Sequence, residues 1–88
     1  MIFITLSRFK KKPTKEMLAE SQKLFEEMAK AGGKLLGMYW TLGRYDTVTI
    51  TEGPDEKTGM KWLMRWADMI STETMVAVPV DEARELVE

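Results

Sequence analysis

The runs KLLGMYWTL at residues 34–42 and DTVTIT at 46–51 decide the fold, because they form neighbouring strand-like segments in the middle of the chain. Aliphatic and aromatic residues dominate the first run and β-branched residues the second, and both kinds pack well on a pleated sheet. The segment between them, Gly43-Arg44-Tyr45, has the length of a hairpin loop. The centre of the chain is therefore predicted to be an antiparallel pair of strands.

A helix is predicted on each side of this hairpin. Apolar residues recur at helical spacing over 15–31, and Thr14 is placed to cap the start of that helix. A second helix is predicted over about 56–70, with Asp55 as its N-cap. This second helix carries two apolar stripes, which is more than packing against one sheet face requires.

Strands are also predicted near both ends of the chain, at 2–6 and at 72–80, and a short acidic helix follows at 81–88. The resulting order, β-α-β-β-α-β, most often folds as a ferredoxin-like α+β sandwich. In that fold a four-stranded antiparallel sheet carries two helices on one face. No linker or repeat interrupts the chain, so residues 1–88 are predicted to form a single domain with its core over about 1–80.

Alternation along the strands predicts which side chains meet the helices. Matching of apolar faces sets Trp40 opposite Val48, whereas a two-residue turn at Gly43-Arg44 would set Trp40 opposite Thr47. We favour the first register, with a three-residue loop, because a slip of one residue would turn every side chain to the wrong face. The side chains then predicted to face the helices are Ile2, Ile4, Leu6, Leu36, Met38, Trp40, Val48, Ile50, Val76 and Val78.

The opposite face of the sheet would carry aromatic residues, methionine and many threonines. A solvated face more often carries lysine and glutamate, so we expect a second sheet to cover this one through face-to-face dimerisation. Half-buried threonines would then line a small cavity, and an exposed Thr-rich sheet is the alternative. The residues predicted on this face are Phe3, Thr5, Leu35, Gly37, Tyr39, Thr41, Thr47, Thr49, Thr51, Met75 and Ala77.

The composition excludes more chemistry than any motif suggests. The chain has neither cysteine nor histidine, so the commonest general base and the usual transition-metal ligands are missing, and we expect no metal and no cofactor. A net charge of −1 makes nucleic acid an unlikely partner despite the basic segment SRFKKKPTK at 7–15. The apolar start is too short to span a membrane, and we expect a cytoplasmic protein.

The segment Gly43-Arg44-Tyr45-Asp46 has a structural and a functional interpretation. In the structural one, the glycine supplies an unusual backbone angle, the aspartate accepts loop N–H groups, and the tyrosine covers the end of the core. In the functional one, Arg44 binds an anion while Tyr45 and Asp46 donate and accept a proton at the mouth of a pocket. We favour the structural interpretation, with a mixed role left open.

The preferred candidate for a pocket is the surface around Tyr39, together with Thr41, Thr49 and Phe3. This pocket would lie between the sheet and the helices or between two sheets. The alternative is a core tyrosine whose hydroxyl bonds to the backbone. The candidate ligand-binding residues are Tyr39, Thr41, Arg44, Tyr45, Asp46 and Thr49, and no catalytic residue is assigned.

The run GGKLLGMYWTLGRYDTVTITEGPD resembles the GYD domain, which is named for a Gly-Tyr-Asp signature that here falls on Gly43, Tyr45 and Asp46. The similarity spans residues 1–80. The resemblance implies a ferredoxin-like fold of the dimeric α/β-barrel kind, and it implies no particular activity because the family is essentially uncharacterised.

Two functions from different classes are therefore open. The first is a non-catalytic module that forms a homodimer or higher homo-oligomer through its sheet and holds a small organic ligand, as a sensor or an accessory subunit. The second is a cofactor-free enzyme of the small monooxygenase or isomerase kind, with a pocket near Tyr39. The absence of histidine disfavours the enzyme without excluding it.

Overall fold

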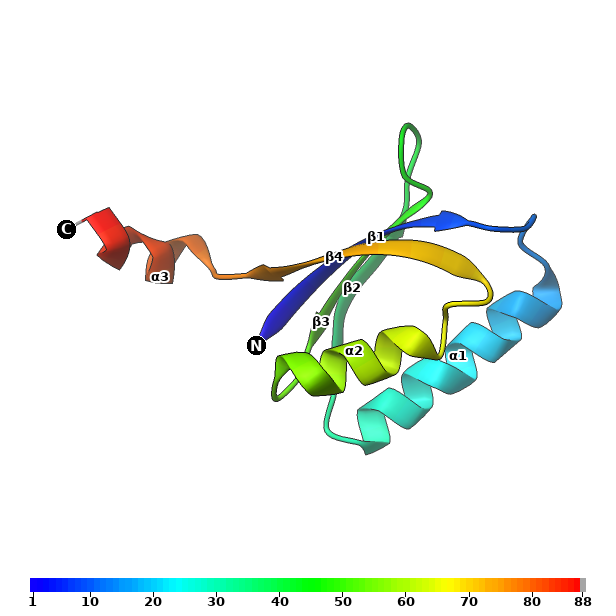
Figure 1. Ribbon diagram of the computed structural model, residues 1–88, viewed down its shortest axis with the longest axis horizontal. Helices are drawn as coiled ribbons and strands as arrows, with labels where there is room; N and C mark the ends of the chain where they lie inside the picture. Colours follow the sequence, from blue (N-terminus) through cyan, green and yellow to red (C-terminus); the bar gives the residue numbers. More distant parts are fainter. Residues whose placement is uncertain (88) are drawn as a thin grey trace.

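Strands and helices follow one another in the predicted order in the computed structural model, which describes residues 1–87 (Figure 1). The last residue of the helix predicted at 81–88 lies outside the described residues. The elements are β1 (Ile2–Phe9), α1 (Lys15–Lys30), β2 (Lys34–Trp40), β3 (Thr47–Glu52), α2 (Glu56–Met64), β4 (Ile70–Ala77), the short α3 (Val80–Ala83) and a 3-10 turn (Arg84–Val87).

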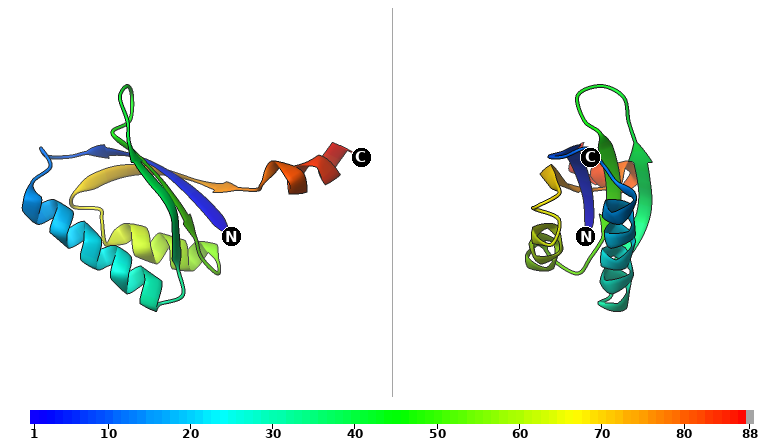
Figure 2. Two further views of the ribbon diagram at one scale, coloured as in Figure 1. Left: turned by 180° about the vertical axis from the view of Figure 1, so that it is seen from behind. Right: turned by 90° about the vertical axis from the view of Figure 1, so that its right-hand side faces the viewer.

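The sheet has four strands in the order β2-β3-β1-β4, and all neighbouring pairs are antiparallel. Both long helices lie on one side of it, as two further views show (Figure 2). This arrangement confirms the predicted ferredoxin-like α+β fold. After β4 the chain leaves the sheet, and α3 projects away from the rest of the molecule (Figure 1).

The predicted caps fix where the helices begin. The Thr14 side chain accepts a hydrogen bond from the Met17 N–H at 3.1 Å, and the Asp55 side chain accepts one from the Thr58 N–H at 2.8 Å. The bond from Thr58 lowers the pKa of Asp55 below its usual range. Both helices are thus held at their N-termini by residues that the sequence identifies.

The second helix is shorter than predicted. It ends at Met64 rather than near residue 70, and bonds of the i to i+3 kind, such as that from Trp66 N–H to the Leu63 carbonyl at 3.0 Å, close its last turns. The chain has to reverse within these turns to enter β4, so Ile70 belongs to the strand and not to the helical stripe.

The predicted register of the central hairpin is wrong by one residue. Trp40 lies opposite Thr47, and the Thr41 N–H bonds to the Asp46 carbonyl at 2.8 Å, so the loop comprises residues 42–45. An irregularity between Leu35 and Gly37 then changes the pairing further along β2. The three-residue loop was predicted because it places Trp40 and Val48 on the same face of the sheet. In the structure Trp40 shares its face with Thr47 instead, and this face meets the helices.

The face assignment is accordingly reversed for β1 and β3. Their threonines and Phe3 face the helices, and their aliphatic residues form the other side of the sheet. The predicted sides of Met38, Trp40 and Val76 are confirmed, since all three face the helices. We define the outward face as the aliphatic side of the sheet, and its main members are Ile2, Ile4, Leu6, Val48, Ile50 and Met75.

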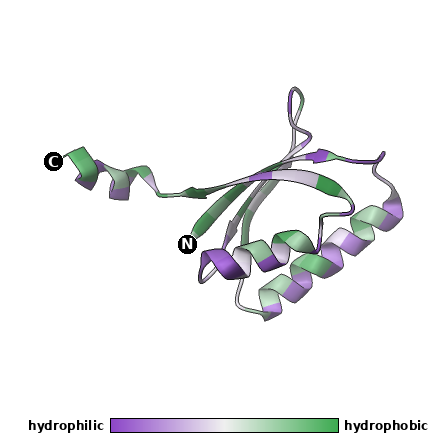
Figure 3. Ribbon diagram, viewed as in Figure 1, coloured by the Kyte–Doolittle hydropathy of each residue, from purple (hydrophilic) through white to green (hydrophobic). Residues whose placement is uncertain are grey.

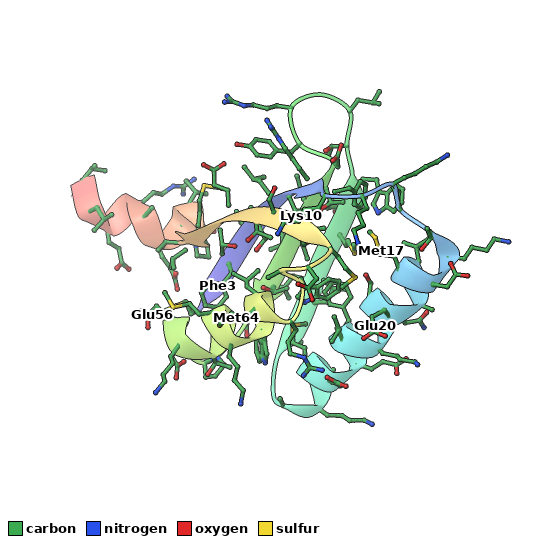
Figure 4. All side chains as sticks on the ribbon, turned by 45° about the vertical axis from the view of Figure 1, so that its right-hand side comes forward. Phe3, Lys10, Met17, Glu20, Glu56 and Met64 are labelled. Atoms are coloured by element: carbon green, nitrogen blue, oxygen red, sulfur yellow. The ribbon has the colours of Figure 1, made fainter. Side chains whose placement is uncertain are left out.

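The core between sheet and helices is small. Among the described residues, the hydrophobic side chains that are buried are Phe3, Leu24 and Met28. Hydrophobic and hydrophilic residues alternate along α1, as its colouring shows (Figure 3). Phe3 lies under α2, where a Cβ added to Gly59 would come within 2.8 Å of its ring (Figure 4). The remaining space between sheet and helices forms a cavity.

Candidate functional site

A cavity of about 320 Å³ lies between the sheet and the two long helices. Ligand sites in proteins usually measure roughly 300–1,000 Å³, so this cavity is at the lower end of that range. All four strands contribute to its floor, while α1, α2 and the turns after α2 supply its roof.

The floor of the cavity is a patch of hydroxyl groups. Some of them bond to each other: the hydroxyls of Thr5 and Thr74 are 3.0 Å apart, and Ser7 bonds to Thr47. Thr5, Ser7 and Thr47 are all buried, at most 8% exposed. The full set of hydroxyl-bearing residues on the floor is Thr5, Ser7, Thr47, Thr49, Thr51 and Thr74.

Aromatic rings and methionines form the walls and the roof. Phe25 and Trp66 join α1 to the turn after α2, with ring centroids 4.8 Å apart, and Phe9 meets Trp40 edge-on at 5.2 Å. Met17, near the start of α1, is one of the methionines that line the cavity (Figure 4). Large apolar members of this lining are Met17, Phe25, Met28, Met38, Trp40, Met60, Trp62, Leu63, Trp66 and Met69.

Charge is nearly absent from the lining. Of the described residues that line the cavity, Glu56 alone has a titratable side chain, and it is exposed at the start of α2 (Figure 4). An ion pair between Arg65 and Glu27, at 2.7 Å, joins the two helices, and both of its side chains are about half exposed. Such an exposed pair contributes little to stability.

The Gly43-Arg44-Tyr45-Asp46 segment lies outside the cavity and joins strands together. Gly43 has a φ of 113°, which favours glycine. One carboxylate oxygen of Asp46 accepts a hydrogen bond from the Phe9 N–H at 2.9 Å, and the Asp46 N–H donates to the Ser7 carbonyl at 2.8 Å. Asp46 therefore fixes the hairpin to the end of β1.

Tyr45 makes a second connection, to β4. Its hydroxyl donates a hydrogen bond to the Glu73 carboxylate, and the Arg8 guanidinium lies 5.4 Å from the centre of its ring. The bond to Glu73 raises the pKa of the Tyr45 hydroxyl above its usual value, because a deprotonated tyrosine would lose it. Ionisation above pH 10 would thus break the connection.

The contacts of Asp46 lead to a testable prediction. Asp46→Ala should lower the free energy of unfolding by about 1–2 kcal/mol, because it leaves the partly buried Phe9 N–H without its acceptor. Urea denaturation at neutral pH measures the change. The matched control is Asp68→Ala, an exposed aspartate that should change stability by less than about 0.5 kcal/mol. Equal effects of the two substitutions would show that the connection does not stabilise the fold.

The structure divides the predicted ligand-binding residues into separate groups. Thr49 lines the cavity. Thr41, Tyr45 and Asp46 lie together at the hairpin, where the Thr41 hydroxyl donates to the Tyr45 carbonyl at 2.6 Å. Arg44 is exposed at the loop. Whether any of these residues binds a ligand stays a prediction.

Tyr39 does not face the cavity. Its side chain is 61% exposed, and it lies beside Val48 on the outward face of the sheet. The structure therefore separates the members of the candidate pocket around Tyr39. Phe3 and Thr49 line the cavity, Thr41 lies at the hairpin, and Tyr39 points to the opposite side of the sheet.

The predicted ligand-binding residues did not include five of the residues whose hydroxyls form the floor, namely Thr5, Ser7, Thr47, Thr51 and Thr74. A pattern in the sequence could have identified most of them. Hydroxyl-bearing residues stand at every second position over 47–51 and at residues 5 and 7, so each set lies on one face of its strand. The sequence does not state which face that is.

The fold and the cavity together define a small ferredoxin-like domain with a partly open pocket of largely apolar lining between its sheet and its helices. The family model of the GYD domain matches residues 3–87, and the chain belongs to this family. None of the curated proteins in the comparison matches the chain.

Two further findings concern residues 1–87. No helix in this part of the chain is long and apolar enough to cross a membrane. The same part of the chain contains no group of three or more histidine, cysteine, aspartate or glutamate side chains that could hold a metal ion.

Proposed function

We propose that the protein is a non-catalytic, homodimeric module that holds a small organic ligand in the cavity between its sheet and its helices. The observation that carries this proposal is the cavity of about 320 Å³, with hydroxyl groups on its floor and apolar side chains on its roof. Such a mixture of a large apolar surface and a few convergent polar groups is typical of ligand sites. A cytoplasmic location is part of the proposal, on the sequence argument above.

A binding role fits the lining better than catalysis does. General acid–base catalysis needs a titratable group within reach of the substrate, and Glu56 is the one such side chain among the described lining residues. Ser7 is buried and bonds to Thr47, with no base beside it among the residues of the lining. The cofactor-free enzyme therefore has less support than the binding module.

A second copy of the chain is the proposed cover of the outward face. Ile4 pairs with Ile50 on one side and Met75 on the other, so the centre of this face is aliphatic. Arg8 and Glu73 lie toward one end of this face, where both contact Tyr45, so the centre of the face carries no charge. A second copy presents an equally aliphatic sheet, which makes it a suitable cover.

The size of the sheet supports a contribution from the C-terminal arm, which we define as residues 78–87. Four strands about 4.8 Å apart and six to eight residues long cover roughly 400–500 Å² in projection. A standard interface buries about 800 Å² per partner. The arm supplies further exposed apolar side chains, namely Val78, Val80, Leu86 and Val87.

Native mass spectrometry of protein purified from its own host tests the proposal. The expected spectrum is a dimer with an additional small mass that mild collisional activation releases. Ser21→Phe, which adds a ring to the cavity, should lose this mass, and Gln22→Phe on the exposed side of α1 should keep it. Retention by Ser21→Phe would contradict the cavity as the site. A bound compound that is chemically converted would favour the enzyme instead.

A further inference from the structure

We propose that the ligand is an uncharged aromatic compound, with two polar atoms along one edge that bond to the hydroxyls of Thr49 and Thr51. This inference rests on the proposed function and names the class of ligand. It uses three features of the cavity: which hydroxyls are free, how little charge lines it, and what the roof is made of.

The hydroxyls of Thr49 and Thr51 differ from those around them. Thr5 already bonds to Thr74, and Ser7 already bonds to Thr47. Among residues 1–87, Thr49 and Thr51 have no hydrogen-bond partner for their side chains, although both line the cavity. Neither hydroxyl is buried without a partner, so solvent reaches both in the free protein, and a ligand that fills the cavity has to replace this water with hydrogen bonds of its own.

Their spacing restricts what they can bind. Thr49 and Thr51 are two residues apart on β3, so their side chains leave the same face of the strand about 7 Å apart. A single polar atom cannot reach both hydroxyls, because two O–H···O hydrogen bonds of about 2.8 Å span at most roughly 5.6 Å. Two polar atoms on the same long edge of a fused ring system match this distance.

The lack of charge favours a neutral ligand. No lysine or arginine lines the cavity among the described residues, and Glu56 is exposed at the start of α2. An anion or a cation in the cavity would lose its hydration without gaining an opposite charge. Neutral hydroxyl, carbonyl or amide groups can instead be satisfied by the threonines.

The roof favours an aromatic ring over an aliphatic chain. Trp62 and Trp66 lie above the floor together with Met28, Met60 and Met69. Indole rings stack on flat ligands, and methionine sulfur makes favourable contacts with aromatic rings while adapting to their shape. The cavity would thus hold a flat ring with its polar edge on β3 and its apolar remainder among the side chains of the walls and the roof.

Equilibrium dialysis of the purified protein with three matched probes tests this inference. The probes are 2,7-dihydroxynaphthalene, naphthalene, and the doubly charged 2,7-naphthalenedisulfonate. The dihydroxy compound should bind most tightly and the disulfonate least. Thr49→Val and Thr51→Val should each weaken binding of the dihydroxy compound about five- to tenfold, and should leave naphthalene unchanged.

Thr72→Val is the control, because Thr72 is an exposed threonine of β4 outside the cavity lining. It should change none of the affinities. Unchanged binding in both Thr49→Val and Thr51→Val, or preferred binding of the disulfonate, would overturn the inference while leaving a ligand-holding cavity intact. The inference would also be overturned, with the cavity still a ligand site, if none of the probes binds while native mass spectrometry shows a retained ligand of another chemical class. Failure of every probe in protein that also carries no retained mass would overturn the proposed function itself.

Discussion

Ile4→Asp is expected to convert the proposed dimer into a monomer. Ile4 lies at the centre of the outward face, between Ile50 and Met75. In a two-fold dimer a single substitution places two carboxylates in the interface, and each would be desolvated without a partner. The dissociation constant should rise about a hundredfold or more. Analytical ultracentrifugation across a range of concentrations measures the shift.

The control for this experiment is Met64→Asp. Met64 is 77% exposed on α2 and lies outside both the outward face and the cavity lining, so the same charge there should leave the dimer intact. Circular dichroism of the Ile4→Asp protein establishes that the monomer is folded. A wild-type protein that sediments as a monomer throughout the range would refute the proposed cover of the sheet.

Phe3→Ala is expected to have the largest effect on stability, a loss of about 3 kcal/mol or more in the free energy of unfolding. Phe3 is 5% exposed and is one of three buried hydrophobic residues in the described chain, so its ring provides much of the contact between sheet and α2. Truncation removes its transfer free energy and enlarges the cavity beside it. Urea denaturation measures the loss.

Phe3→Leu separates packing from ring-specific effects, because it restores most of the volume and should recover more than half of the lost stability. Phe9→Ala serves as a comparison at the other end of β1, where the ring is only partly buried and contacts Trp40. A loss below about 1 kcal/mol for Phe3→Ala would show that the helices are held to the sheet by other contacts.

The order of elements follows from local patterns in the sequence, and for that reason it was predictable. Thr14 and Asp55 announce helix starts through side chains that accept backbone N–H groups a few residues away. The end of α2 was harder to predict. Trp66 and Met69 continue the helical spacing of apolar residues, but in the structure they follow the helix and line the cavity from a turn. Tertiary contacts there override the local periodicity.

The faces of β1 and β3 were not predictable from alternation alone. Ile4 and Thr5 alternate in polarity, which identifies two faces but not which one meets the helices. The usual assumption assigns aliphatic residues to the helices. Here the threonines face them instead, because the space under the helices is a partly polar cavity and the aliphatic residues are left for the outward face.

The candidate site was predictable only in part for the same reason. Thr49 was named as a ligand-binding residue and does line the cavity, whereas Tyr39 was placed with it through an incorrect register. One step of slip between neighbouring strands exchanges every partner across the sheet. The register depends on the length of the hairpin loop, which comprises residues 42–45. The sequence of this segment is compatible with several turn types of different length, so it does not determine the register.

The position of the Gly-Tyr-Asp signature has a consequence for how this family is interpreted. Tyr45 and Asp46 hold the hairpin to its neighbouring strands and contribute nothing to the lining of the cavity. A signature in this position acts on the scaffold, whereas the proposed ligand site is built from other residues. Under the proposed function, the residues that would decide what this protein binds are Thr49, Thr51 and those of the roof.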